Sequence, residues 1–159
     1  MLNDTGGVEQ AVAARVRAAR MKFRKLGGIL CMRGASLRMK GVVYKACVRS
    51  MLTYGAETLA MKARVFKGCE PQRRMLRMIY GVTLKDMAES TVIALRVGVD
   101  DLEEHLRQKR LRWFGHIARR DEEVKIKKVF ELKIEGQRKR GRPVKRWIDV
   151  VEEDMKKGI

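Results

Sequence analysis

The sequence predicts an all-α protein: an irregular bundle of about five to seven helices, with a basic linker and a C-terminal amphipathic helix. Two observations support this prediction. Apolar residues recur at steps of three and four in successive segments, and N-cap residues precede two of those segments at Ser36 and Asp100. Strand-like patterning is weak enough that we expect at most one short strand pair.

Residues 1–60 are expected to form a helical hairpin followed by a turn. The first stripe consists of Val8, Val12, Val16, Ala19, Phe23, Leu26 and Leu30, and Gly27-Gly28 weakens its end. Ser36 then caps a second helix, whose stripe is Leu37, Tyr44, Val48 and Met51. Neither helix can bury its stripe alone, so the two should pack together. The segment Tyr54-Gly55-Ala56-Glu57-Thr58 breaks the pattern as a turn or a short extended piece.

Residues 61–122 form a second predicted helical region. A helix is expected from Gln72 to Tyr80, with Pro71 kinking or interrupting the chain before it. A short helix near residues 88–97 leads to Gly98. Asp100 and Glu103 then have the spacing of a capping box, and Asp101 and Glu104 add negative charge at the positive end of the helix dipole. The apolar stripe of this helix is predicted to be Leu102, Leu106, Trp113 and Ile117.

Residues 123–159 are predicted to combine a linker with a closing helix. Residues 124–134 are amphipathic but rich in β-branched side chains, so their structure stays ambiguous. Residues 136–142 are a polar, basic linker. The last helix has Pro143 in its first turn and buries Val144, Trp147, Ile148, Val151 and Met155. Its acidic residues are expected on the solvent side: Asp149, Glu152, Glu153 and Asp154.

The charge balance points to a polyanionic partner. The chain has 37 Lys and Arg against 19 Asp and Glu, a formal net charge of +18. Such an excess repels itself unless a polyanion neutralises it, and nucleic acid is the expected partner. No apolar run is long enough to span a membrane and no signal-peptide layout opens the chain. We therefore expect an intracellular protein, nuclear or cytoplasmic, that is neither secreted nor bound to a membrane.

The sequence contains no recognisable catalytic or metal-binding constellation. Asp100-Asp101 lacks the preceding aromatic residue of a polymerase metal site and is better explained as a helix cap. On one helix, His105 and His116 would stand roughly 16 Å apart, too far to share a metal ion. The three cysteines, Cys31, Cys47 and Cys69, have neither disulfide nor zinc spacing and are expected to be reduced and mostly packed. No cofactor and no metal are implied.

The candidate nucleic-acid-binding residues fall into three groups. The first two helices carry Arg17, Arg20, Arg24, Arg38, Lys45 and Arg49. Arg110 and Arg112 flank the stripe of the later helix. The third group is the linker run Arg138, Lys139, Arg140, Arg142, Lys145 and Arg146. The Arg-Gly-Arg-Pro core of this run is similar to an AT-hook and also to a nuclear localisation signal, with a solvated linker as the alternative. Contacts to phosphates would have little sequence specificity.

Four motifs resemble one protein family. In chain order, the first motif is the segment around Tyr44 and the second is Leu52-Thr53-Tyr54-Gly55-Ala56-Glu57-Thr58. The third motif is Leu111-Arg112-Trp113-Phe114-Gly115-His116, and the fourth consists of Gly141-Arg142-Pro143 followed by Trp147. In this order they resemble the region after the catalytic palm of non-LTR (LINE-type) retrotransposon reverse transcriptases. The family-motif residues are Tyr54, Gly55, Glu57, Trp113, Gly115, His116, Gly141, Pro143 and Trp147. The Gly68–Pro71 interruption departs from the family pattern.

The resemblance implies a fragment of a reverse transcriptase rather than a complete enzyme. Residues 1–60 would be a thumb-like hairpin that packs against a template and primer, in RNA:DNA hybrid, RNA or DNA form, and the missing palm would be the protein partner. Polymerase activity is not expected from the chain alone. His116 is interpreted as a residue at a helix packing edge, with Gly115 allowing close approach. Two alternatives remain: a domesticated DNA-binding protein that uses the Arg-Gly-Arg-Pro segment, and a protein-interaction module built from the Trp147 helix.

Overall fold

The computed structural model of the chain describes residues 7–60, 70–132 and 146–157, with side chains from residue 10 onward. The described part is all-helical, as predicted, and contains no strand. Counting α3, η1 and α4 as one continuous helix, it forms eight helices, slightly more than the five to seven expected, plus the short 3-10 helix η2. The elements are α1 (Gly7–Lys25), α2 (Gly27–Leu30), α3 (Leu37–Val43), η1 (Tyr44–Arg49), α4 (Ser50–Leu52), η2 (Ala56–Thr58), α6 (Glu70–Tyr80), α7 (Ser90–Val97), α8 (Leu102–Ala118), α9 (Lys125–Glu131) and α10 (Trp147–Lys156).

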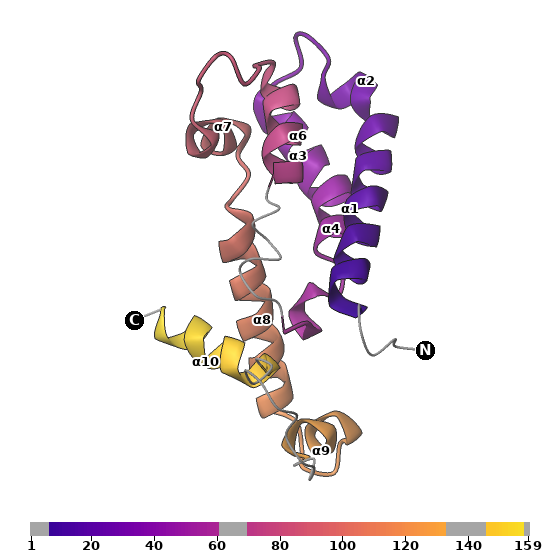
Figure 1. Cartoon of the computed structure of the whole chain (residues 1–159), viewed down its shortest axis with the longest axis vertical. Helices are drawn as coiled ribbons and strands as arrows, with labels where there is room; N and C mark the ends of the chain where they lie inside the picture. The colour runs from indigo at the N-terminus through magenta and orange to yellow at the C-terminus, as the bar shows by residue number, and fades with distance from the viewer. Residues whose placement is uncertain (1–6, 61–69, 133–145, 158–159) are drawn as a thin grey trace, which may run out of the picture.

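The helices are arranged along one elongated body (Figure 1). Helices α1, α3, α4 and α6 lie together, with α7 beside them, and the long helix α8 leads away toward α9. Helix α10 crosses α8 and packs on it. Helix α8 therefore connects the N-terminal helices to the C-terminal ones.

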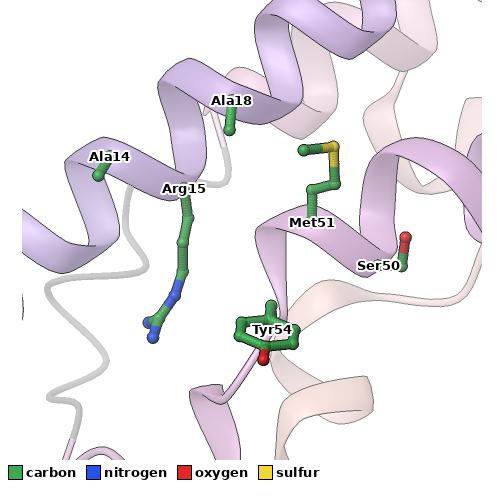
Figure 2. A pocket seen from close by; sticks show the side chains of 6 residues that line it. All are labelled: Ala14, Arg15, Ala18, Ser50, Met51 and Tyr54. Carbon is green, nitrogen blue, oxygen red and sulfur yellow. The ribbon is translucent and has the colours of Figure 1, made fainter.

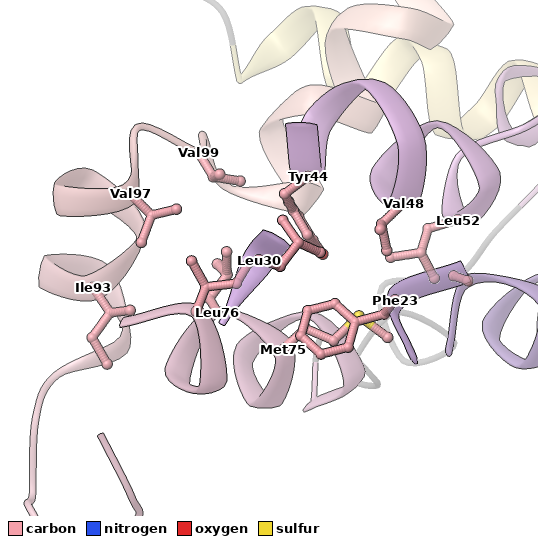
Figure 3. Packing of buried hydrophobic residues seen from close by; sticks show 12 residues of the cluster. Phe23, Leu30, Tyr44, Val48, Leu52, Met75, Leu76, Ile93, Val97 and Val99 are labelled. Atoms are coloured by element: carbon pink, nitrogen blue, oxygen red, sulfur yellow. The ribbon is translucent and has the colours of Figure 1, made fainter. Parts of the chain in front are cut away.

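The first core confirms most of the predicted apolar stripes. Ala19, Phe23 and Leu30 are buried from the first stripe, and Tyr44 and Val48 from the second. Met75, Leu76 and Ile79 of α6 close this core together with Ile93, Val97 and Val99 (Figure 3). The predicted N-cap is also confirmed, because the Ser36 hydroxyl accepts a hydrogen bond from the Met39 backbone N–H at 3.2 Å.

The second stripe departs from prediction at its end because η1 is a π-helix. A π-turn contains more residues than an α-turn and so rotates every later side chain around the axis. Met51, predicted to be buried, is 36% exposed, whereas Leu52 is 7% exposed and enters the core. The prediction that Met51 lies in the core was therefore wrong.

Helices α6 and α7 extend the core and approach α3 closely. Helix α6 begins at Glu70, so Pro71 lies in its first turn, where the missing N–H costs no helical hydrogen bond. Helix α7 ends at Gly98, whose φ of 72° suits a left-handed C-cap. At the α3 contact, a Cβ on Gly41 would lie 1.9 Å from the carbonyl oxygen of Val97. Only glycine permits this approach.

The start of α8 differs by one residue from the prediction. Asp101, not Asp100, is the N-cap, and its carboxylate accepts hydrogen bonds from the backbone N–H groups of Glu103 and Glu104. Leu102, Leu106 and Ile117 of the predicted stripe are buried. Leu102 and Leu106 form a second, smaller core with Ala56 of η2.

The structure shows what residues around 125–131 form, and it changes the predicted buried face of the last helix. Within the ambiguous segment 124–134, Lys125–Glu131 forms the helix α9, and residues 133–134 lie outside the described residues. In α10, Val150, Val151 and Asp154 are buried, whereas Met155 is exposed. The predictions that Met155 is buried in the stripe and that Asp154 faces solvent were both wrong. The side of α10 that faces α8 carries Asp154, which forms an ion pair with Arg110 of α8. Helix α10 begins at Trp147 after an extended Arg146, so the predicted start of this helix at Pro143 was wrong; Pro143 and Val144 themselves lie outside the described residues.

Candidate nucleic-acid interface

Exposed basic side chains line the first two helices. Arg17, Arg20 and Arg24 follow one another at helical spacing on α1, and all three are exposed. Arg38 of α3 and Lys45 of η1 are exposed as well. Within the described part of the chain, none of these five residues forms an ion pair with an acidic side chain. They are free to contact an external anion.

Arg49 does not belong to this exposed set, contrary to expectation. Its side chain is 3% exposed, and its guanidinium donates hydrogen bonds to Asp100 Oδ2 at 2.9 Å and to the Asp100 carbonyl oxygen at 3.3 Å. The π-turn explains why Arg49 is buried while Lys45 is exposed. The turn spans Tyr44–Arg49, so it rotates the Arg49 side chain around the helix axis, away from the direction of Lys45. The Arg49 guanidinium holds the pKa of the Asp100 carboxyl below its usual range. Arg49 is a structural residue.

Arg110 is the second exception. Its Nε donates to Asp154 Oδ2 at 2.7 Å, and the two side chains are 8% and 7% exposed. The neighbouring Arg107 donates from Nη1 to the Asp154 carbonyl oxygen at 2.8 Å. These contacts hold α10 on α8, so Arg110 is not available to a phosphate.

The remaining predicted basic residues divide between surface and undescribed chain. Arg112 is exposed on α8. Arg146 is exposed, and its guanidinium pairs with Asp149 at 3.0 Å while its backbone N–H donates to the same carboxylate. The rest of the linker run lies outside the described residues: Arg138, Lys139, Arg140, Arg142 and Lys145. The AT-hook hypothesis thus stays a prediction.

Glu57 brings together motifs that are distant in the sequence. Its carbonyl oxygen accepts a hydrogen bond from Trp147 Nε1 at 2.7 Å, across 90 residues. Its carboxylate lies 3.4 Å from Lys109 Nζ, which also donates to the Thr53 carbonyl oxygen at 3.1 Å. Gly55 precedes η2 with a left-handed φ of 59°. The turn after α4 is thereby connected to α8 and to α10.

Aromatic contacts surround the Trp147 end of this junction. Phe114, Phe130 and Trp147 contact one another with ring centroids 5.8–6.5 Å apart. Trp113 stacks on His116 at 5.4 Å, and His116 Nε2 lies 3.2 Å from an Arg120 nitrogen. His116 is exposed, and both contacts are with neighbours three and four residues away along the chain, so its place at a helix packing edge stays a prediction.

Among the described residues, Gly115 has no close neighbour on another helix. A Cβ there would meet the guanidinium of Arg119, at 3.1 Å, which is the flexible end of a side chain four residues further along the chain. The close helix approach expected at Gly115 is therefore not found within the described part of the chain. The other two glycine and proline positions of the motif set, Gly141 and Pro143, lie outside the described residues.

A groove that the sequence did not indicate lies between α1 and α4. Its volume is about 470 Å³, and it is lined by Ala14, Arg15, Ala18, Ser50, Met51 and Tyr54 (Figure 2). Tyr54 is 78% exposed. No pattern in the sequence indicated this groove, because Met51 lines it only as a result of the π-turn in η1.

The described residues contain no group of three or more His, Cys, Asp or Glu side chains able to hold a metal ion. Cys31 is exposed rather than packed, Cys47 is half-buried, and both are free thiols. None of the helices described is long and apolar enough to cross a bilayer. Comparison of the chain with protein families, with curated proteins and with solved structures gave no match.

Proposed function

We propose that this chain binds nucleic acid through its phosphates, with little sequence specificity, as the post-palm part of a LINE-type reverse transcriptase would. The observation that carries the proposal is the exposed set Arg17, Arg20, Arg24, Arg38 and Lys45, none of which forms an ion pair with an acidic side chain in the described part of the chain. The net charge of +18 supports it. The chain would hold a template and primer, while the catalytic step belongs to a palm elsewhere.

Binding to phosphates predicts a strong dependence on salt. Each neutralised phosphate of a duplex contributes about 0.9 to the slope of log affinity against log salt concentration. Fluorescence anisotropy with labelled duplex DNA, RNA:DNA hybrid and single-stranded RNA should give steep slopes and similar affinities for unrelated sequences. Absence of binding to all three at low salt would refute the proposal.

A triple variant locates the interface. Replacing Arg17, Arg20 and Arg24 with Ala should lower the duplex slope by about 2.7 if all three contact phosphates. The matched control replaces Lys125, Lys128 and Lys156, which are exposed on α9 and α10 and carry the same total charge. The control should retain most of the slope; equal losses in both variants would mean that only net charge matters.

The two alternative functions differ in their support. Trp147 is half-buried, donates its indole N–H inside the chain and packs on Phe114 and Phe130, which leaves less of its ring for a protein partner. The other part of that alternative, the acidic face of the Trp147 helix, is exposed at Glu152 and Glu153, and a stable dimer in sedimentation without nucleic acid would favour it. The minor-groove alternative would show preference for AT-rich duplex over RNA:DNA hybrid, and loss of that preference in an Arg140→Ala, Arg142→Ala variant.

A further inference from the structure

The groove between α1 and α4 has the dimensions and lining of a small-ligand site. Its volume of about 470 Å³ lies within the usual range for such sites. Ala14 and Ala18 contribute only methyl groups from α1, while Met51 and Tyr54 lie across from them (Figure 2). An almost wholly exposed tyrosine beside a shallow apolar surface offers one face of its ring for stacking.

Arg15 gives this groove a positive charge. Its side chain is half-buried and lines the groove, and it forms no ion pair with an acidic side chain among the described residues. An anionic group in the groove would therefore be attracted to it. Ser50 also lines the groove; its hydroxyl donates to the Ala46 carbonyl oxygen at 2.6 Å, which leaves its oxygen able to accept a hydrogen bond.

We propose that this groove binds one unpaired nucleobase of a single-stranded nucleic acid, stacked on Tyr54, with the positive charge of Arg15 close to the phosphate of that nucleotide. This inference rests on the proposed function. A nucleotide combines a flat apolar base with an anionic phosphate, which matches an apolar groove that has an exposed aromatic ring and an arginine in its lining. Arg17 follows Ala14 by three residues on α1, a neighbouring position on the helix surface, where it can contact the adjacent phosphate.

The stacked base predicts an affinity that depends on bases as well as phosphates. The test compares a short single-stranded DNA with an abasic strand of the same length and charge, by fluorescence anisotropy at one salt concentration. The strand with bases should bind the protein roughly 5- to 150-fold more tightly, which is the range for one stacked base. Tyr54→Ala should remove this difference and leave affinity for the abasic strand unchanged, while Tyr54→Phe should keep it.

A matched control separates the site from general surface effects. Leu95→Ala replaces an apolar side chain on α7 that is 81% exposed, and it should keep the preference for bases. Equal binding of both strands by the unaltered protein, or a preference that survives Tyr54→Ala, would overturn the inference and leave the proposed function standing. Failure of both strands to bind at low salt would overturn the inference, and the proposed function would fall with it only if duplex DNA, RNA:DNA hybrid and single-stranded RNA also failed to bind.

Discussion

Arg110 and Asp154 form a buried ion pair, 2.7 Å between Nε and Oδ2, that joins α8 to the C-terminal helix α10. The two residues are 44 positions apart in the sequence. Arg107 adds a hydrogen bond to the Asp154 backbone, so α10 is held both by polar contacts and by the burial of Val150 and Val151. Removing one partner would leave the other charge in a site with little water.

Asp154→Ala should destabilise the protein by about 3–5 kcal/mol, because Arg110 would stay buried without its counter-charge. Urea unfolding followed by circular dichroism measures this change. The double variant Arg110→Met, Asp154→Leu should lose much less, since it removes both charges and keeps the volume. Glu152→Ala, an exposed position on the same helix, is the control and should change stability little. A small loss in Asp154→Ala would show that the pair does not hold α10.

The π-turn in η1 predicts opposite effects at two adjacent residues. Leu52→Ala should cost about 2–5 kcal/mol, because Leu52 is buried in the first core. Met51→Ala should cost less than about 1 kcal/mol, because Met51 is partly exposed and lines the groove. Chemical denaturation of both variants tests which of the two side chains faces the core. A larger loss of stability in Met51→Ala than in Leu52→Ala would indicate an uninterrupted α-helix.

The two helical glycines Gly41 and Gly115 should respond in opposite directions to alanine. Gly41→Ala brings a methyl group onto the Val97 carbonyl and should destabilise by about 1–3 kcal/mol or more. Within the described residues, Gly115→Ala meets the flexible end of the Arg119 side chain and should stabilise α8 by up to about 1 kcal/mol, the gain in helix propensity. Thermal unfolding measures both. Equal destabilisation at the two sites would contradict the difference in their surroundings.

The Arg49–Asp100 pair predicts a loss of stability in acid. The pKa of Asp100 is lowered in the folded protein, so its contribution is present above the unfolded-state pKa of about 4 and is lost as the pH falls through the folded value. Asp100→Asn should therefore destabilise the protein at pH 7, and the difference from wild type should shrink below about pH 4. Denaturation midpoints across pH test this. Asp121→Asn, at an exposed carboxylate, serves as the control.

Local pattern was sufficient for much of the secondary structure. The helical periodicity predicted α1, the helix after Ser36, α6, α7 and α8, because burial of one face imposes a 3.6-residue spacing that is visible without tertiary information. The Ser36 cap was also visible, since capping depends on residues only three positions apart. The predicted exposure of Arg17, Arg20 and Arg24 follows from the same periodicity.

The sequence by itself thus determined the all-α class, most of the core and the basic excess, all of which depend on composition and short-range spacing. Tertiary structure decided which charges remain on the surface. Arg49 and Arg110 have the same local pattern as their exposed neighbours, and only the approach of Asp100 and Asp154 from distant segments compensates their burial. The junction at Glu57 and the groove beside Tyr54 likewise arise from long-range packing and from the π-turn, neither of which a periodic pattern can reveal.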